Sequence, residues 1–210
     1  MKTRIFNLII LDESGSMESI KQQAITGVNE TIQTIRNAQK QHEEQEHYVS
    51  LVSFNSGSVK DIYDRIQADK AEELTDKMYM PDCCTPLYDA MGISLNKLRK
   101  SVAEEDKVLV TIITDGYENA SREYNGEAIK ALVDNLKSRG WVFTYIGANQ
   151  DVEKVAATIS VTNVMSFQTS VEGTKAMFAQ ESKSRKRWFD KVADGCANLA
   201  ENFFDDEDKK

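Results

Sequence analysis

The sequence predicts an α/β fold with a doubly wound, mostly parallel sheet, helices on both faces and one antiparallel edge strand. Four short segments are nearly continuous in apolar and β-branched residues, and segments with apolar residues at helical spacing separate them. Continuous apolar runs suit strands that are covered on both faces. Alternation of strands with helices favours parallel pairing. One further segment follows the turn Asn-Ser-Gly, which is typical of an antiparallel hairpin.

The predicted strands can be placed in order along the chain. The first covers residues 4–12 and ends at Asp12. Residues 58–66 are expected to be the edge or hairpin partner of residues 47–54, and a weaker strand is expected last. The strands after the first are predicted at residues 47–54, 58–66, 106–115, 141–148 and 162–167.

Helices are predicted between the strands from apolar stripes and from residues that begin or end helices. Pro86 stands where the first turn of the second helix is expected. Gly140 follows the third helix, as glycine often follows a last turn. The last helix would carry Trp188 and Phe203 on one face. The predicted helices are residues 18–41, 87–98, 126–139, a short helix after Asp151, and about 172–203.

These elements fit a single Rossmann-like domain. The chain has 210 residues, which is enough for one domain with a proper core. No linker or internal repeat divides it, so we expect one domain over residues 1–204. Residues 205–210, with the charged sequence DDEDKK, are expected to be a disordered tail. Ligands of such sheets bind beyond the carboxyl ends of the strands.

Composition argues against several classes of function. The net charge of -8 disfavours binding to nucleic acid and to an anionic membrane surface. The first apolar run ends at Asp12 rather than at a small-residue cleavage site, so we expect a cytoplasmic protein without a membrane span. The 3 cysteines are an odd number, and we expect reduced, partly buried thiols. His42 and His47 are expected to be solvated.

Oxygen-bearing side chains follow two of the predicted strands. Asp12 ends the first strand, and Ser14 and Ser16 follow it in a loop in which Gly15 permits a tight turn. Asp115 ends a later strand that could be its neighbour. Carboxylates and hydroxyls without sulfur or imidazole suit Mg²⁺, Mn²⁺ or Ca²⁺. Two carboxylates balance the charge of such an ion, and an open position on it would attract an acidic group.

Residues 12–16 resemble the DxSxS signature of the von Willebrand factor A family. Residues 84–90 resemble the threonine loop of that family and residues 114–116 its aspartate loop, in the family's order. The resemblance implies a metal-ion-dependent adhesion site that holds Mg²⁺ (or Mn²⁺ or Ca²⁺). It implies a non-enzymatic module that binds an Asp or Glu carboxylate of a protein partner. The implied metal ligands are Asp12, Ser14, Ser16, Thr85 and Asp115.

Two other functions stay open. Asp12 at a strand end is also compatible with a Mg²⁺-dependent phosphatase or hydrolase that uses an aspartyl nucleophile. Such enzymes carry a second acidic residue two positions later, where this chain has Ser14. Family analogy also allows an accessory subunit of an AAA+ ATPase or of a stress-resistance system.

Some neighbouring residues have an ordinary structural interpretation. Ser14 or Ser16 could cap the next helix. Glu13 is expected to point to solvent. Residues 117–119 are expected to line the rim as a polar loop, and the basic run at residues 183–188 is expected to be a solvated helix face, with a docking patch as the alternative.

Overall fold

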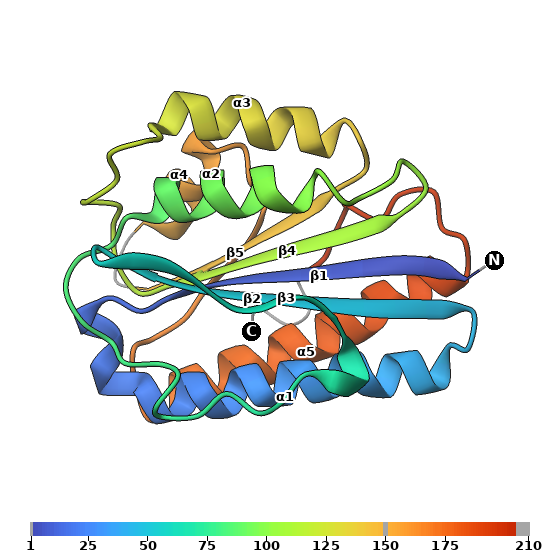
Figure 1. Cartoon of the computed structure of the whole chain (residues 1–210), viewed down its shortest axis with the longest axis horizontal. Coiled ribbons are helices and arrows are strands. Elements are labelled where there is room, and N and C mark those ends of the chain that lie inside the picture. The colour runs from blue at the N-terminus through green and yellow to red at the C-terminus, as the bar shows by residue number, and fades with distance from the viewer. Residues whose placement is uncertain (1, 149–150, 205–210) are drawn as a thin grey trace.

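The computed structural model describes residues 2–148 and 151–204 and contains a six-stranded sheet (Figure 1). The strand order is β3-β2-β1-β4-β5-β6. β1 pairs in parallel with β2 and with β4, and only β3 at one edge runs antiparallel to its neighbour. The predicted fold class is therefore confirmed. The strands are β1 (Thr3–Asp12), β2 (Gln45–Asn55), β3 (Ser58–Gln67), β4 (Lys107–Thr114), β5 (Val142–Gly147) and β6 (Asn163–Ser166).

Helices cover both faces of this sheet. In Figure 1, α1 and α5 lie below the sheet, and α2, α3 and α4 lie above it. Short 3-10 turns, η1 and η2, precede α1 and follow β3. The helical elements are η1 (Gly15–Ile20), α1 (Lys21–Gln41), η2 (Ala68–Lys70), α2 (Leu87–Leu98), α3 (Gly126–Lys137), α4 (Val152–Thr158) and α5 (Val171–Ala193).

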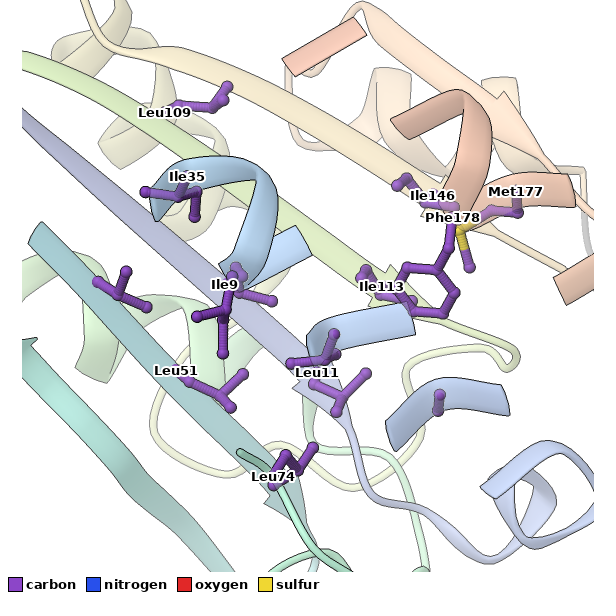
Figure 2. Packing of buried hydrophobic residues seen from close by; sticks show 14 of the residues in the cluster. Ile9, Leu11, Ile35, Leu51, Leu74, Leu109, Ile113, Ile146, Met177 and Phe178 are labelled. Atoms are coloured by element: carbon purple, nitrogen blue, oxygen red, sulfur yellow. The ribbon is translucent and has the colours of Figure 1, made fainter. Parts of the chain in front are cut away.

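Two hydrophobic cores result from the alternation of side chains along the buried strands. Ile5 and Ile9 of β1 belong to the cluster shared with α1 and α5, whereas Leu8 and Ile10 belong to the cluster shared with α2 and α3. Figure 2 shows part of the first cluster, with Phe178 of α5 among the side chains of the sheet. Burial on both faces explains why the central strands have continuous apolar sequences.

Strand order determines where a ligand can approach. From β1 the chain continues to β2 on one side of the sheet, and β4 lies on the other side of β1. The carboxyl ends of β1 and β4 therefore flank the point at which the strand order reverses, where open α/β sheets bind ligands.

The last helix is shorter than its sequence predicts. α5 ends at Ala193, not near Phe203. Gly195 has a φ of 66°, its N–H donates to the carbonyl of Val192, and the N–H of Cys196 donates to the carbonyl of Lys191. This pair of bonds with a left-handed glycine is a Schellman motif, which ends a helix. Phe203 still enters the core of α1 and α5 through the segment that follows.

Three expectations about polar residues are wrong. His47 is fully buried in β2, where its ring meets that of Phe189 edge to face. Within the basic run at residues 183–188, Arg185 is fully buried, so this run is not simply a solvated face. The three cysteines are free thiols as expected, but all are exposed instead of partly buried.

Two further expectations concern the ends of the chain and membranes. The predicted tail at residues 205–210 lies outside the described residues. Among the residues that are described, no helix combines the length and apolar character that crossing a bilayer requires.

Candidate metal site

The first part of the site is the loop after β1. Asp12 is the last residue of β1 and is fully buried. Its Oδ1 accepts a hydrogen bond of 2.7 Å from the backbone N–H of Ser14, which folds the loop back on the strand. The hydroxyl oxygens of Ser14 and Ser16 lie 3.2 Å apart. Ser14 occupies the N-cap position of η1, but its side chain makes no capping bond. The capping interpretation therefore does not account for its hydroxyl.

The second part is the end of β4, which lies beside β1. Leu11 pairs with Ile113, so the residues that follow them are adjacent. The hydroxyl of Thr114 donates to Oδ2 of Asp12 at 2.6 Å. The hydroxyl of Ser16 donates to Oδ1 of Asp115 at 2.5 Å. These bonds join the loop after β1 to the loop after β4 around two buried carboxylates.

The third part is the segment that leads into α2. Thr85 is buried, its N–H donates to Oδ1 of Asn119 at 2.9 Å, and its carbonyl accepts from the N–H of Asn119 at 3.1 Å. A Cβ at Gly116 would lie 3.6 Å from Oγ1 of Thr85 and 3.9 Å from Oγ of Ser16. Both hydroxyls therefore lie around one point beside Asp115, and the structure brings the five predicted residues together from three loops.

Glu13 corrects an expectation within the motif. Its side chain is buried rather than solvated, and its Oε1 accepts from the N–H of Met80 at 2.5 Å. Its carbonyl accepts from the N–H of Asp82 at 2.9 Å. The N–H of Gly15 donates in turn to the carbonyl of Cys83 at 3.1 Å. Glu13 thus attaches the segment before α2 to the loop after β1.

Residues whose supporting role the sequence did not reveal surround the site. The hydroxyl of Tyr79, fully buried, donates to the carbonyl of Asp12 at 2.6 Å. Glu118 accepts from the N–H groups of Tyr88, Ala120 and Ser121. Residues 118 and 119 are therefore structural parts of the loop, whereas Tyr117 is exposed. The contacts of Tyr79 with Asp12 and of Glu118 with Tyr88 join loops that are remote in sequence, so no local sequence pattern marks them.

The two carboxylates carry negative charge in a buried place. The pKa of Asp12 is raised to about 6, mainly by burial and in smaller part by the nearby charge of Asp115, while the hydrogen bonds from Thr114 and Ser14 oppose the increase. Burial also raises the pKa of Asp115, while the bond from Ser16 lowers it. Ser14 and Thr114, which donate hydrogen bonds to the Asp12 carboxylate, are uncharged. A nearby cation would therefore stabilise the charged forms of the Asp12 and Asp115 carboxylates.

The donor set is made of oxygen atoms. In the part of the chain that the structure describes, no group of three or more His, Cys, Asp or Glu gathers in a metal-binding arrangement. The predicted set contains two carboxylates and three hydroxyls, which suits a hard cation and not zinc.

Comparison with known proteins identifies relatives of the fold. A family model for the von Willebrand factor type A domain matches residues 8–182. No curated protein matches the chain. The pilus adhesin SpaC of Lactobacillus rhamnosus GG in its open conformation is similar with a TM-score of 0.65 and 15% identity, over 90% of this chain and 30% of that one.

Two other solved structures show the same likeness. A von Willebrand factor type A protein of Catenulispora acidiphila has a TM-score of 0.57 and 13% identity, over 85% of this chain and 42% of that one. The SpRpn10 VWA domain has a TM-score of 0.53 and 10% identity, over 84% of this chain and 94% of that one. The chain thus spans less than half the length of the adhesin and of the C. acidiphila protein, and at these identities the likeness concerns the fold alone.

Proposed function

Since this chain belongs to the von Willebrand factor type A family, we propose that it is a cation-dependent protein-binding module. Asp12, Ser14, Ser16, Thr85 and Asp115 hold one divalent cation, Mg²⁺ or a similar hard ion. The cation in turn binds an Asp or Glu carboxylate of a partner protein. One observation carries the proposal: hydroxyls from two loops, Ser16 and Thr85, lie around the same point beside the buried carboxylate of Asp115.

The chemistry of these residues supports a cation rather than a purely structural network. Asp12 and Asp115 are buried close enough for one charge to raise the pKa of the other carboxyl. Burying like charges is costly unless a counter-charge is present. A divalent cation balances two carboxylates, and the hydroxyls add neutral oxygen ligands of the kind that Mg²⁺ and Mn²⁺ accept.

The role of the partner follows from that balance. Ser16 is exposed, whereas Asp12, Ser14 and Thr85 are buried. A cation held from the protein side would supply a positive centre that attracts an anionic oxygen from outside. A carboxylate on another protein is such an oxygen.

Hydrolysis with Asp12 as nucleophile is disfavoured by the same geometry. The side chain is fully buried, and its two oxygens accept hydrogen bonds from Ser14 and Thr114. A nucleophilic carboxylate needs an oxygen that can reach the substrate.

Direct measurement of Mn²⁺ binding tests the cation site. We expect the wild-type protein to bind one Mn²⁺. Asp12→Asn replaces a charged carboxylate with a neutral amide, and Thr85→Ala removes a hydroxyl ligand, so each should weaken binding by at least about tenfold. Electron paramagnetic resonance of free Mn²⁺ measures the affinity. Asp61→Asn is the matched control, since it removes a carboxylate that pairs with Lys97 at the edge of the sheet. Equal affinity in Asp12→Asn and Asp61→Asn would refute the site.

A crystal grown with Mn²⁺ tests the role of the partner. The proposal expects a carboxylate oxygen from a neighbouring molecule, or a water that such an oxygen can replace, at the outward position of the ion. An ion enclosed entirely by residues of its own chain would contradict it.

A further inference from the structure

Two neighbouring cysteines lie in the segment that joins the candidate metal site to α2. Cys83 and Cys84 are both free and exposed. Cysteine is among the residues most often buried in proteins, so two consecutive exposed thiols contribute little to packing. Thr85, the next residue, is buried in the site. The thiols are therefore accessible to reagents in solution, at a place where a change of backbone reaches a proposed metal ligand.

The backbone at Cys83 is fixed by contacts with the loop after β1. Its carbonyl accepts from the N–H of Gly15 at 3.1 Å, and its own N–H donates to Oδ1 of Asp82 at 2.8 Å. A Cβ at Gly15 would lie 3.5 Å from the Cys83 carbonyl oxygen and 3.6 Å from its nitrogen. Cys83 has a φ of 61°, in the left-handed region that few residues other than glycine adopt. The peptide between the two cysteines is thus held against the centre of the DxSxS loop.

We propose that Cys83 and Cys84 form a reversible thiol–disulfide site that controls the cation site. The oxidant is a low-molecular-weight disulfide of the glutathione class. The thiolate of one cysteine attacks a sulfur of this disulfide, forms a mixed disulfide and releases one small thiolate, which takes up a proton. The thiolate of the other cysteine then attacks the protein sulfur of the mixed disulfide and releases the second small thiol. The two protein sulfurs are oxidised by two electrons, and the small disulfide is reduced to two thiols.

A disulfide between consecutive residues is strained. Neighbouring Cα atoms lie about 3.8 Å apart across a trans peptide, whereas disulfides usually join Cα atoms about 4.4–6.8 Å apart. Strained disulfides are more easily reduced than relaxed ones, which suits a reversible bond. A disulfide between Cys83 and Cys84 closes a small ring. The strain falls on the peptide between the two residues, because this ring contains no other peptide.

Closing this ring changes the contacts that hold the site. The peptide plane turns, so the Cys83 carbonyl no longer accepts from Gly15 and Thr85 shifts with the chain. Metal affinity depends on the groups that orient the ligands, and losing one of them weakens binding about 10- to 100-fold. This consequence rests on the proposed cation site, whereas formation of the disulfide does not.

The first experiment tests the disulfide alone. Full-length Cys196→Ser is incubated in buffers with increasing ratios of oxidised to reduced glutathione, acid-quenched, alkylated and analysed by peptide mass spectrometry. We expect a peptide containing residues 83 and 84 that has lost two hydrogen atoms and carries no alkyl group, and we expect dithiothreitol to reverse the change. Cys83→Ser and Cys84→Ser, each combined with Cys196→Ser, should give only mixed disulfides with glutathione. The proposal would be overturned if Cys196→Ser, which keeps Cys83 and Cys84, gave mixed disulfides or dimers but no disulfide between these two residues.

The second experiment tests control of the cation site. Mn²⁺ affinity is measured on the reduced and oxidised forms of Cys196→Ser, and we expect oxidation to weaken it by about tenfold or more. A Cys83→Ser/Cys84→Ser double variant in the same background should show no redox effect. If the disulfide forms and the affinity stays the same, control is refuted. If the reduced protein binds no Mn²⁺, the proposed function and the control both fail, while the disulfide stands on its own measurement.

Discussion

A buried ion pair lies within α5, and its arginine also connects this helix to the sheet. Arg185 donates to Glu181 at 2.7 Å, to Oδ1 of Asn7 at 2.9 Å and to Oγ1 of Thr111 at 2.8 Å. Both members of the ion pair have almost no exposed surface. The guanidinium is thus held by β1 and β4, the two strands that end at the candidate metal site. Removing one partner of a buried pair leaves a charge that nothing compensates.

We therefore expect Glu181→Gln to lower the free energy of unfolding by about 3–5 kcal/mol. The double variant Glu181→Leu/Arg185→Met should lose less than Glu181→Gln does, because it leaves no buried charge. Urea denaturation of both variants and of the wild type gives the comparison. A cost below about 1 kcal/mol for Glu181→Gln, a value ordinary for exposed pairs, would show that the pair is hydrated in solution.

His47 makes stability depend on pH. The pKa of its imidazole is lowered to about 3, mainly by burial and in smaller part by the positive charges of His42 and Arg185. The folded pKa lies below the ordinary value of 6.5. The unfolded chain therefore binds more protons than the folded protein between these values, and stability falls as the pH decreases from about 6.5 towards 3.

We expect His47 to contribute a slope approaching about 1.4 kcal/mol per pH unit in this window. His47→Phe should remove this contribution, so its free energy of unfolding should fall less steeply than that of the wild type between pH 6.5 and about pH 3, the window set by the two pKa values. Chemical denaturation at several pH values measures the slopes. His42→Gln is the control, since it removes the other imidazole and leaves His47 in place with burial, the largest cause of its lowered pKa, intact. Parallel profiles for wild type and His47→Phe would contradict the assignment.

The same residues show what sequence patterns miss. The five candidate metal ligands could be proposed from the sequence because each ends a strand, follows one or precedes a helix in a recognisable motif. Glu13, His47 and Arg185 could not, because their environment is made by partners from other elements. Arg185 and Asn7, for example, are 178 positions apart. Exposed and buried polar side chains look alike until the sheet brings such partners together.

At the scale of the elements, the sequence predicted the strands and helices but not every end. α2 begins at Leu87, directly after Pro86, as expected. α5 stops at Ala193 because Gly195 takes a left-handed conformation, which the apolar stripe through Phe203 concealed. The apolar stripe predicted burial correctly, since Phe203 packs in the core although its segment is not helical. Apolar spacing reports which residues face the core, and caps determine where the helix ends.

The contact between α1 and α5 depends on a glycine. A Cβ at Gly27 would lie 2.0 Å from Cδ2 and 2.1 Å from Cγ of Phe178. Both atoms are near the base of a fully buried ring, so the ring cannot avoid the methyl group by a small rotation. The two helices approach closely at this position because residue 27 has no side chain.

We expect Gly27→Ala to destabilise the fold by about 1–3 kcal/mol through overpacking, despite the better helix propensity of alanine. Phe178→Ala alone should also destabilise, because it removes most of a core side chain. In the double variant the two costs should not add, since alanine lacks the Cγ and Cδ2 atoms that the methyl group would meet. Thermal or urea denaturation of the four proteins completes the cycle. Additive costs would indicate that α1 and α5 separate instead of clashing.

At the scale of the whole molecule, the net charge of -8 and the candidate metal site should make stability depend on salt in two different ways. Self-repulsion of an acidic chain is weakened by any salt through screening. Binding of a cation at the candidate site stabilises the folded state specifically, because only the folded chain brings Asp12, Thr85 and Asp115 together. Screening and specific binding can therefore be separated by comparing MgCl₂ with NaCl at equal ionic strength.

We expect MgCl₂ to raise the melting temperature more than NaCl does. At a free Mg²⁺ concentration 100 times the Kd, linkage gives about 2.7 kcal/mol, which for a domain of this size corresponds to roughly 5–10 °C. The melting temperature of Asp12→Asn should respond equally to the two salts, because its acidic surface is still screened by salt while its cation site is lost. Asp61→Asn should retain the difference, because it changes the net charge by the same amount away from the site. If all three proteins respond equally to both salts, the acidic surface alone accounts for the effect of Mg²⁺, and the loops after β1 and β4 are a hydrogen-bonded network without a cation.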